Sequence, residues 1–198
     1  MLLDIVILPP LSVASLVADK VKKASLGYRA EFLVDNKRLW HHVSLFHVVV
    51  ARNRLPLVLR LVNSFAANLP KVILKSKGVV RESRSLWLEF TYPRVLIKYK
   101  NQVIQALAPL RQGSMPYTSS HPLTPLRKRY RECYGVYYNI GRFFHPHFTL
   151  AKYASKREAE EILRKLRIPT ISFSVSILAV AQVNDYGQVT RILKRFRV

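Results

Sequence analysis

The chain has 198 residues, of which 33 are Lys or Arg and 11 are Asp or Glu, so its formal net charge is +22 at pH 7. Hydrophobic residues make up 49% of the sequence, which is enough for a folded core and excludes general disorder. A single domain is the default at this length, and the charge favours a polyanionic partner, nucleic acid before an anionic membrane surface.

The single cysteine, Cys133, excludes an internal disulfide and a cysteine-based zinc cluster, which fits a reducing, cytoplasmic compartment. No apolar run reaches the ~18 residues that a membrane-spanning helix needs. The first ten residues contain an acid, Asp4, and no basic residue, unlike a signal peptide. We therefore expect a cytoplasmic protein that does not bind a membrane. From charge alone, a generally basic soluble protein or a ribosome-associated protein remains open.

Strands and helices alternate along the first half of the chain. Runs rich in β-branched and aromatic residues predict the strands, and apolar residues at i, i+3, i+4 and i+7 predict the helices. The clearest helix begins at Leu55 and ends before Pro70. In chain order, the predicted elements are a strand at 1–8, a helix from Ser12 to about Gly27, an extended stretch at 31–36, a central strand at 40–50, the helix after Leu55, strands at 72–74 and 86–90, and a helix at 95–110.

A connector separates this half from the second. Residues 109–125 hold four of the eleven prolines and form no regular element, and a basic run with an aromatic inside it follows at 127–131. The remaining predicted elements are strands at 135–138 and 148–153, a helix with a capping box at Ser155 and Glu158 that ends before Pro169, a strand of alternating apolar and serine residues at 171–177, a turn at 184–187 and a strand at 189–193.

A four-residue pattern occurs twice, once in each half. Residues 42–45 are His-Val-Ser-Leu, and residues 147–150 are His-Phe-Thr-Leu. In a strand, residues i and i+2 point to the same face, so each imidazole lies beside a hydroxyl while Val43 and Phe148 point to the core. If the halves pack as similar lobes, two imidazoles and two hydroxyls converge in the cleft between them.

Two imidazoles on either side of one phosphate suit phosphodiester chemistry without a metal. A neutral histidine takes a proton from the attacking water or hydroxyl, and a protonated one donates to the leaving oxygen. An unperturbed pKa near ~6.5 makes both states accessible at neutral pH, and the hydroxyls hydrogen-bond the non-bridging oxygens. A single His-x-Ser or His-x-Thr arises by chance and is more often structural, so the repetition carries the hypothesis.

The paired motifs resemble the His-x-Thr/Ser-x signature of the two-histidine (2H) phosphoesterase superfamily, which includes RNA 2′,3′-cyclic phosphodiesterases and bacterial 2′-5′ RNA ligases. The resemblance covers most of the chain, from the opening strand that ends in prolines to the helix and strands after the second motif. It implies a bilobal, pseudo-twofold α+β fold, with two antiparallel-rich sheets around a central groove and helices outside. We expect one such domain over residues 1–198, with a connector between the halves at roughly 109–131.

By this resemblance, His42 is expected to be the general acid for the leaving ribose oxygen and His147 the base that activates water. Ser44, in place of the commoner threonine, and Thr149 are expected to hold the phosphate. The implied activity is hydrolysis of RNA-like 2′,3′-cyclic phosphates to phosphomonoesters by a monomer that needs no cofactor and no metal. An RNA 2′-5′ ligase with the same site, or a non-catalytic RNA- or nucleotide-binding module, is the alternative.

Three further residues are candidates for substrate binding. Arg142 flanks the second motif, His145 shares a strand face with His147, and Tyr130 belongs to the basic run, where cations and aromatics interleave as on RNA-binding surfaces. Each of these residues also has a structural interpretation, as part of a solvated loop or a strand surface.

Four other residues are expected to lie outside the site. Odd spacing from His42 places His41 and His47 on the opposite strand face, and the same argument weakens the case for Lys152. His121 lies in the connector without a partner that suggests a role. A zinc site from the histidines at 41, 42, 145 and 147 is not expected, because adjacent strand residues diverge and no cysteine or nearby carboxylate completes the ligand set.

Overall fold

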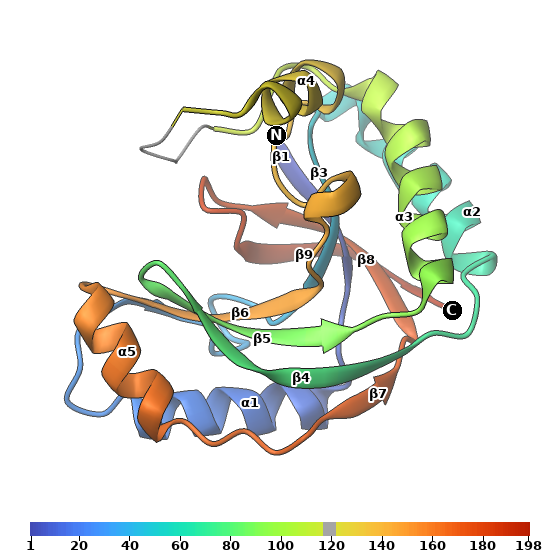
Figure 1. Ribbon diagram of the computed structural model, residues 1–198. Helices are drawn as coiled ribbons and strands as arrows, with labels where there is room; N and C mark the ends of the chain where they lie inside the picture. The colour runs from blue at the N-terminus through green and yellow to red at the C-terminus, as the bar shows by residue number, and fades with distance from the viewer. Residues whose placement is uncertain (117–121) are drawn as a thin grey trace.

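The computed structural model describes residues 1–116 and 122–198, which form two antiparallel sheets with helices on their outer faces (Figure 1). The four-stranded sheet has the order β3-β1-β8-β9, and the five-stranded sheet has the order β2-β6-β5-β4-β7. The strands are β1 (Leu2–Ile7), β2 (Ala30–Leu33), β3 (Val43–Val49), β4 (Ile73–Glu82), β5 (Ser85–Thr91), β6 (His147–Tyr153), β7 (Ser172–Ser174), β8 (Ile177–Val183) and β9 (Val189–Arg197). The helices are α1 (Leu11–Ala24), α2 (Leu55–Ala67), α3 (Arg94–Leu107), α4 (Pro125–Tyr134) and α5 (Lys156–Lys165), with short 3₁₀ turns η1 (Arg52–Arg54), η2 (Ala108–Leu110) and η3 (Gly141–Phe143).

Each sheet has its own pair of covering helices. Helices α2 and α3 contact the four-stranded sheet, and α1 and α5 contact the five-stranded sheet (Figure 1). The predicted periodicity explains this packing, since α2 buries Val58, Val62 and Ala66, which recur every four residues on one face. The predicted capping box of α5 is present, with reciprocal bonds between Ser155 and Glu158. The predicted α+β class with two antiparallel sheets and outer helices is confirmed.

The two lobes are the two sheets, and each sheet combines strands from both halves of the chain. Strands β1 and β3 precede the connector, yet β1 pairs with β8 from the second half, and β8 pairs in turn with β9. Likewise β6 and β7 from the second half join β2, β4 and β5 from the first. The second residues of the two motifs, Val43 and Phe148, are fully buried, as predicted.

Several predicted boundaries are wrong, for local reasons. The strand expected at 40–50 begins only at Val43, so His42 lies directly before it. Residues 135–138 form no strand, because Gly135 ends α4 in the left-handed conformation, with a φ of 74°. The alternating run at 171–177 divides between β7 and the start of β8, and Pro10 rather than Ser12 lies at the N-terminus of α1.

The remaining differences concern the connector and membrane spans. Part of the connector, including His121, lies outside the described residues, and the basic run at 127–131 belongs to α4. Across residues 1–116 and 122–198, no helix is long and apolar enough to cross a membrane.

Candidate active site

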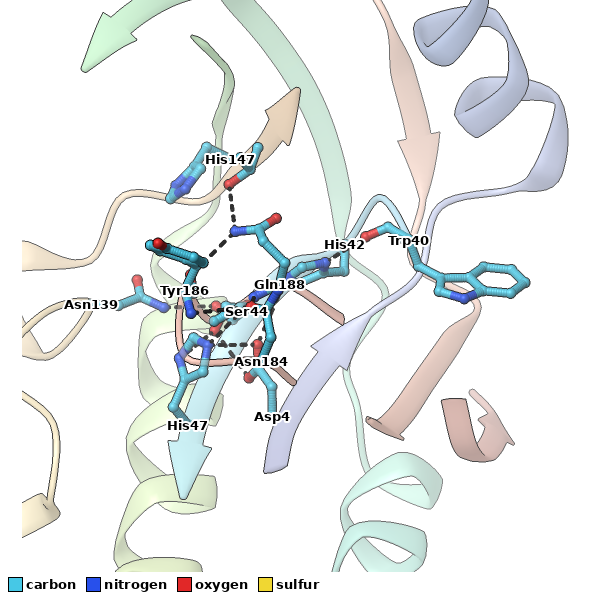
Figure 2. Close-up of polar contacts among 12 residues, drawn as sticks. Asp4, Trp40, His42, Ser44, His47, Asn139, His147, Asn184, Tyr186 and Gln188 are labelled. Carbon is cyan, nitrogen blue, oxygen red and sulfur yellow. Dashed lines mark hydrogen bonds and ion pairs between the residues drawn. The ribbon is translucent and has the colours of Figure 1, made fainter. Parts of the chain in front are cut away.

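A cleft of about 560 Å³ is lined by the four polar side chains of the two motifs, His42, Ser44, His147 and Thr149. His42 lies directly before β3 of the four-stranded sheet and Ser44 lies on β3, and His147 and Thr149 lie on β6 of the five-stranded sheet. Figure 2 shows His147 on one side and His42 with Ser44 on the other, with Gln188 between them. The convergence that the repeated motif predicts is therefore present.

His42 is held by its own loop. Its Nδ1 lies 2.7 Å from the carbonyl oxygen of Trp40, and because a carbonyl only accepts, Nδ1 carries the hydrogen. The other ring nitrogen, Nε2, lies 3.8 Å from Oδ2 of the buried Asp4. Burial lowers the pKa of His42, and the negative charge of Asp4 opposes that change.

His147 has the same tautomer but different surroundings. Its Nδ1 donates to the carbonyl oxygen of His145 at 2.6 Å, and its ring stacks on Trp87 with the centroids 4.0 Å apart. Burial lowers the pKa of His147 to about 4, and the positive charge of His42 adds to this decrease. At neutral pH the ring is therefore uncharged, with the lone pair on Nε2.

The two hydroxyls differ in their hydrogen bonds. Thr149 Oγ1 accepts from Nε2 of Gln188 at 3.5 Å, and its own hydrogen has no acceptor among the described residues. Ser44 Oγ lies 3.0 Å from Oδ1 of Asp4 and 3.1 Å from Nδ1 of His47. Ser44 therefore belongs to a buried network, whereas Thr149 is free to donate into the cleft.

A β-bulge in β3 changes which residues of this strand face the cleft. Between β1 and β3, Ile5 pairs with Phe46 and Val6 pairs with Ser44, so that Leu45 is the extra residue. One extra residue reverses the alternation of faces along the rest of a strand. Residues after Leu45 therefore point to the side opposite to the one their number predicts.

The second motif contains a bulge at the same position. Between β5 and β6, Leu86 pairs with Ala151 and Trp87 pairs with Thr149, so that Leu150 is the extra residue. In both strands the bulged residue is the fourth residue of the motif, and both of these leucines are fully buried.

The bulges overturn the expectation that His47 and Lys152 face away from the site. Both line the cleft, and both stand five residues after the histidine of their motif. The sequence contains a signal for this change, because each motif continues with two adjacent apolar residues, Leu45-Phe46 and Leu150-Ala151, where strict alternation requires a polar one.

Asp4 is one of the site residues that sequence reasoning missed, together with Trp87, Tyr186 and Gln188 of the cleft lining. It pairs directly with His47 across β1 and β3, is fully buried, and lies 3.2 Å from Nε2 of His47 through Oδ2. Burial raises the pKa of Asp4 to about 7 and lowers that of His47 to about 4. The buried Lys100 on α3 lies close enough to interact with both groups, and burial lowers its pKa to about 7.

The other predicted site residues have different placements. His145 lines the cleft. Tyr130 does not, but it packs against Phe143, which lines the cleft. The side chain of Arg142 lies outside the described part of the structure. His41 is buried away from the cleft, where its ring hydrogen-bonds Asn36.

One end of the cleft is aromatic and basic. Tyr186 lies there with Phe32, and Nζ of Lys152 lies 4.4 Å from the centre of the Tyr186 ring while it pairs with Glu31 at 2.8 Å. Arg127 also lines the cleft. Among residues 1–116 and 122–198, no group of three or more His, Cys, Asp or Glu side chains is arranged to hold a metal ion.

Comparisons with known proteins identify the fold and the family of the chain. The chain is similar to the solved structure of TT0787 from Thermus thermophilus, with 15% identity, a TM-score of 0.62, and coverage of 100% of this chain and 97% of that one. Two structures of Usb1 from Kluyveromyces marxianus, one with uridine monophosphate, are each 12% identical, with TM-scores of 0.44 and 0.46, and cover 100% of this chain and 98% and 96% of theirs. No match was found among curated proteins. A family model described as the 2′-5′ RNA ligase superfamily matches residues 9–187, so the chain belongs to that superfamily of 2H phosphoesterases.

Proposed function

We propose that this chain is a metal-independent cyclic phosphodiesterase that hydrolyses RNA-like 2′,3′-cyclic phosphates to phosphomonoesters. The observation that carries the proposal is the convergence of two His-x-Ser/Thr pairs on one cleft, each with its imidazole Nδ1 tied to a backbone carbonyl. This bond leaves Nε2 of both rings as the nitrogen able to exchange a proton with a substrate.

The surroundings of the two imidazoles support different roles for them. The Asp4 carboxyl group lies 3.8 Å from Nε2 of His42, and no carboxyl group shifts the pKa of His147, so we assign His42 as the general acid that protonates the leaving ribose oxygen. His147 lies on Trp87 without a carboxylate among the groups that shift its pKa, so it is the neutral base that removes a proton from water. Water attacks the phosphorus, its proton passes to His147, and the ring P–O bond breaks as His42 donates its proton. Thr149 donates to a non-bridging oxygen as negative charge develops there.

The surface charge supports an RNA-like substrate. A formal charge of +22 attracts a phosphate backbone, and Arg127 and Lys152 bring cations to the cleft itself. The exposed ring of Tyr186, beside Lys152, is a surface on which an unpaired base can stack.

Hydrolysis of a nucleoside 2′,3′-cyclic phosphate in the presence of EDTA tests the proposal. His42→Ala and His147→Ala should each lower kcat at least ~100-fold, since a positioned acid or base contributes roughly 10²–10⁴-fold. His41→Gln is the matched control, because this neighbouring imidazole is buried but does not line the cleft. Turnover in either alanine variant equal to that of the control, or activity only with a divalent metal, would contradict the proposal.

The same assay separates the proposal from its alternatives. RNA halves that end in a 2′,3′-cyclic phosphate and a 5′-hydroxyl are joined by a ligase and only hydrolysed by a phosphodiesterase. Salt-sensitive RNA binding without any product indicates a binding module instead.

A further inference from the structure

A continuous chain of polar groups runs beneath the first motif (Figure 2). Oδ1 of Asp4 lies 3.0 Å from Ser44 Oγ, which lies 3.1 Å from Nδ1 of His47, and Nε2 of His47 lies 3.4 Å from the carbonyl oxygen of Gly187. Asp4 and His47 are paired residues of β1 and β3, Ser44 also lies on β3, and Asp4 and His47 are buried.

The number of protons on Asp4, Ser44 and His47 decides which of these groups donates in each hydrogen bond. The Gly187 carbonyl only accepts, so Nε2 of His47 carries a hydrogen. In the neutral arrangement, the Asp4 carboxyl group donates to Ser44 and the Ser44 hydroxyl donates to Nδ1 of His47. In the ion-pair arrangement, both bonds reverse, since His47 donates to Ser44 and Ser44 donates to the Asp4 carboxylate. The two arrangements contain the same number of protons, and in both the Ser44 hydrogen points into the protein.

Ser44 can donate to a phosphate oxygen and keep both of its present hydrogen bonds only if both of its partners donate to it. This requires a protonated Asp4 and a protonated His47 at the same time, which is one proton more than either arrangement above contains. Thr149 has no such requirement, because Gln188 is a permanent donor to it. Ser44 of the first motif therefore needs an additional proton on its partners before it binds an anion, whereas Thr149 of the second motif does not.

We propose that Asp4 and His47 are positioning residues of the first motif, and that a phosphate bound at Ser44 draws one proton from solvent onto the Asp4–Ser44–His47 network. The inference rests on the proposed function in that the phosphate is that of the substrate or product. The proton enters on Nδ1 of His47, the Ser44 hydrogen turns toward the phosphate, and the charge gained by the network faces the anion.

Titratable groups on several neighbouring elements affect this proton uptake. Those that face Asp4 or His47 are His42 before β3, Lys100 on α3, Tyr138 after α4, and His147 on β6. The positive charge of Lys100 lowers the pKa of His47, as burial does, so the free network is neutral near pH 7. An anion in the cleft has the opposite effect and raises it.

Nitrogen-15 NMR of the histidine rings at pH 7, before and after saturation with adenosine 2′-monophosphate, tests the inference. In the free protein we expect His47 as the neutral Nε2–H tautomer, and in the complex we expect both of its ring nitrogens to carry hydrogen. A His47→Asn variant assigns the resonances. A His47 ring that is already charged without nucleotide, or that stays neutral at saturation, would overturn the inference, as would a nucleotide that perturbs no histidine.

Ser44→Ala and Thr149→Ala form a matched pair of variants. Removal of the Ser44 hydroxyl breaks the link, so the His47 signals should no longer change on nucleotide binding, whereas they should still change in Thr149→Ala. An equal response in both variants would also overturn the inference. The readout is independent of turnover, so a His47 response without hydrolysis refutes only the proposed function, and hydrolysis without a His47 response refutes only the proton uptake.

Discussion

Asp4 illustrates how burial and pairing decide the behaviour of a single side chain. It is the one charged residue in the otherwise apolar strand β1, and its carboxyl group is fully buried between the imidazoles of His42 and His47. Oδ2 has no hydrogen-bond partner among the described residues. An isolated buried carboxylate is unfavourable, so this group retains its proton to a higher pH than an exposed aspartate.

This retained proton gives a stability prediction for Asp4→Asn. The folded-state pKa of Asp4 is about 7, against 3.8 for the unfolded chain. Its contribution to stability is therefore present below pH 3.8 and is lost as the pH rises through 7. Asparagine has no charge to bury, so from pH 6 to pH 8.5 the unfolding free energy of the variant should rise by about 1 kcal/mol relative to wild type.

Urea unfolding at the two pH values measures this difference, and the comparison with wild type cancels the titrating groups that do not interact with Asp4. Asp19→Asn, at an exposed position of α1, is the control and should show no such change. If the difference between Asp4→Asn and wild type is the same at both pH values, the carboxyl group of Asp4 does not titrate in this range.

At the scale of elements, the turn between β8 and β9 forms part of the cleft wall and contacts His47. Gly187 in this turn has a φ of 73°, and a Cβ there would lie 2.9 Å from Nε2 of His47. The close approach lets the Gly187 carbonyl reach the ring. Glycine is thus required at this position both by the backbone conformation and by the neighbouring imidazole.

Gly187→Ala should therefore lower both stability and activity on a cyclic phosphate. Gly27 is a matched control, since it has a φ of 81° but nothing within 4 Å of an added Cβ. Both substitutions place a side chain in the left-handed region, at a cost of about 1–2 kcal/mol, but only Gly187→Ala displaces His47. Equal losses of stability and activity in the two variants, from urea unfolding and initial rates, would show that the contact with His47 is unimportant.

Elements with a clear apolar period were predictable from the sequence, and strand faces were not. The helices after Leu55 and Ser155 carry an apolar stripe and, in the second case, a capping box, so local residues decide them. The faces of His47 and Lys152 depend on bulges at Leu45 and Leu150. Counting by twos fails there, because the register of a strand is set by its partners as well as by its own residues.

For the whole molecule, the repeated motif predicted the meeting of four side chains but not the route of the chain. Each sheet contains strands from both sides of the connector; in the four-stranded sheet, for example, β1 lies between β3 and β8. Such long-range pairing leaves no local trace in the sequence, and the same holds for Asp4, whose role exists only through strands from elsewhere in the chain. The roles of His42 and His147 stay predictions that the activity assay decides.

The buried histidines also predict how the whole molecule responds to acid. Burial lowers the pKa of His41 to about 3 and those of His47 and His147 to about 4. Below pH 6.5 the unfolded chain binds protons that these folded rings do not, so stability is lost as the pH falls toward 4. Asp4 acts in the opposite direction over the same range. Burial also lowers the pKa of His42, which adds to this loss. The four histidines outweigh Asp4, so the unfolding free energy should be lower at pH 5 than at pH 7 by on the order of 3 kcal/mol.

Urea unfolding at pH 5 and pH 7 measures this loss. His41→Gln should reduce the difference between the two pH values, since it removes one buried imidazole that takes no part in the cleft. A wild-type protein as stable at pH 5 as at pH 7 would mean that these imidazoles are protonated in the folded state. A charged His147 is no general base, so that result would also remove the assigned acid and base roles from the proposed reaction.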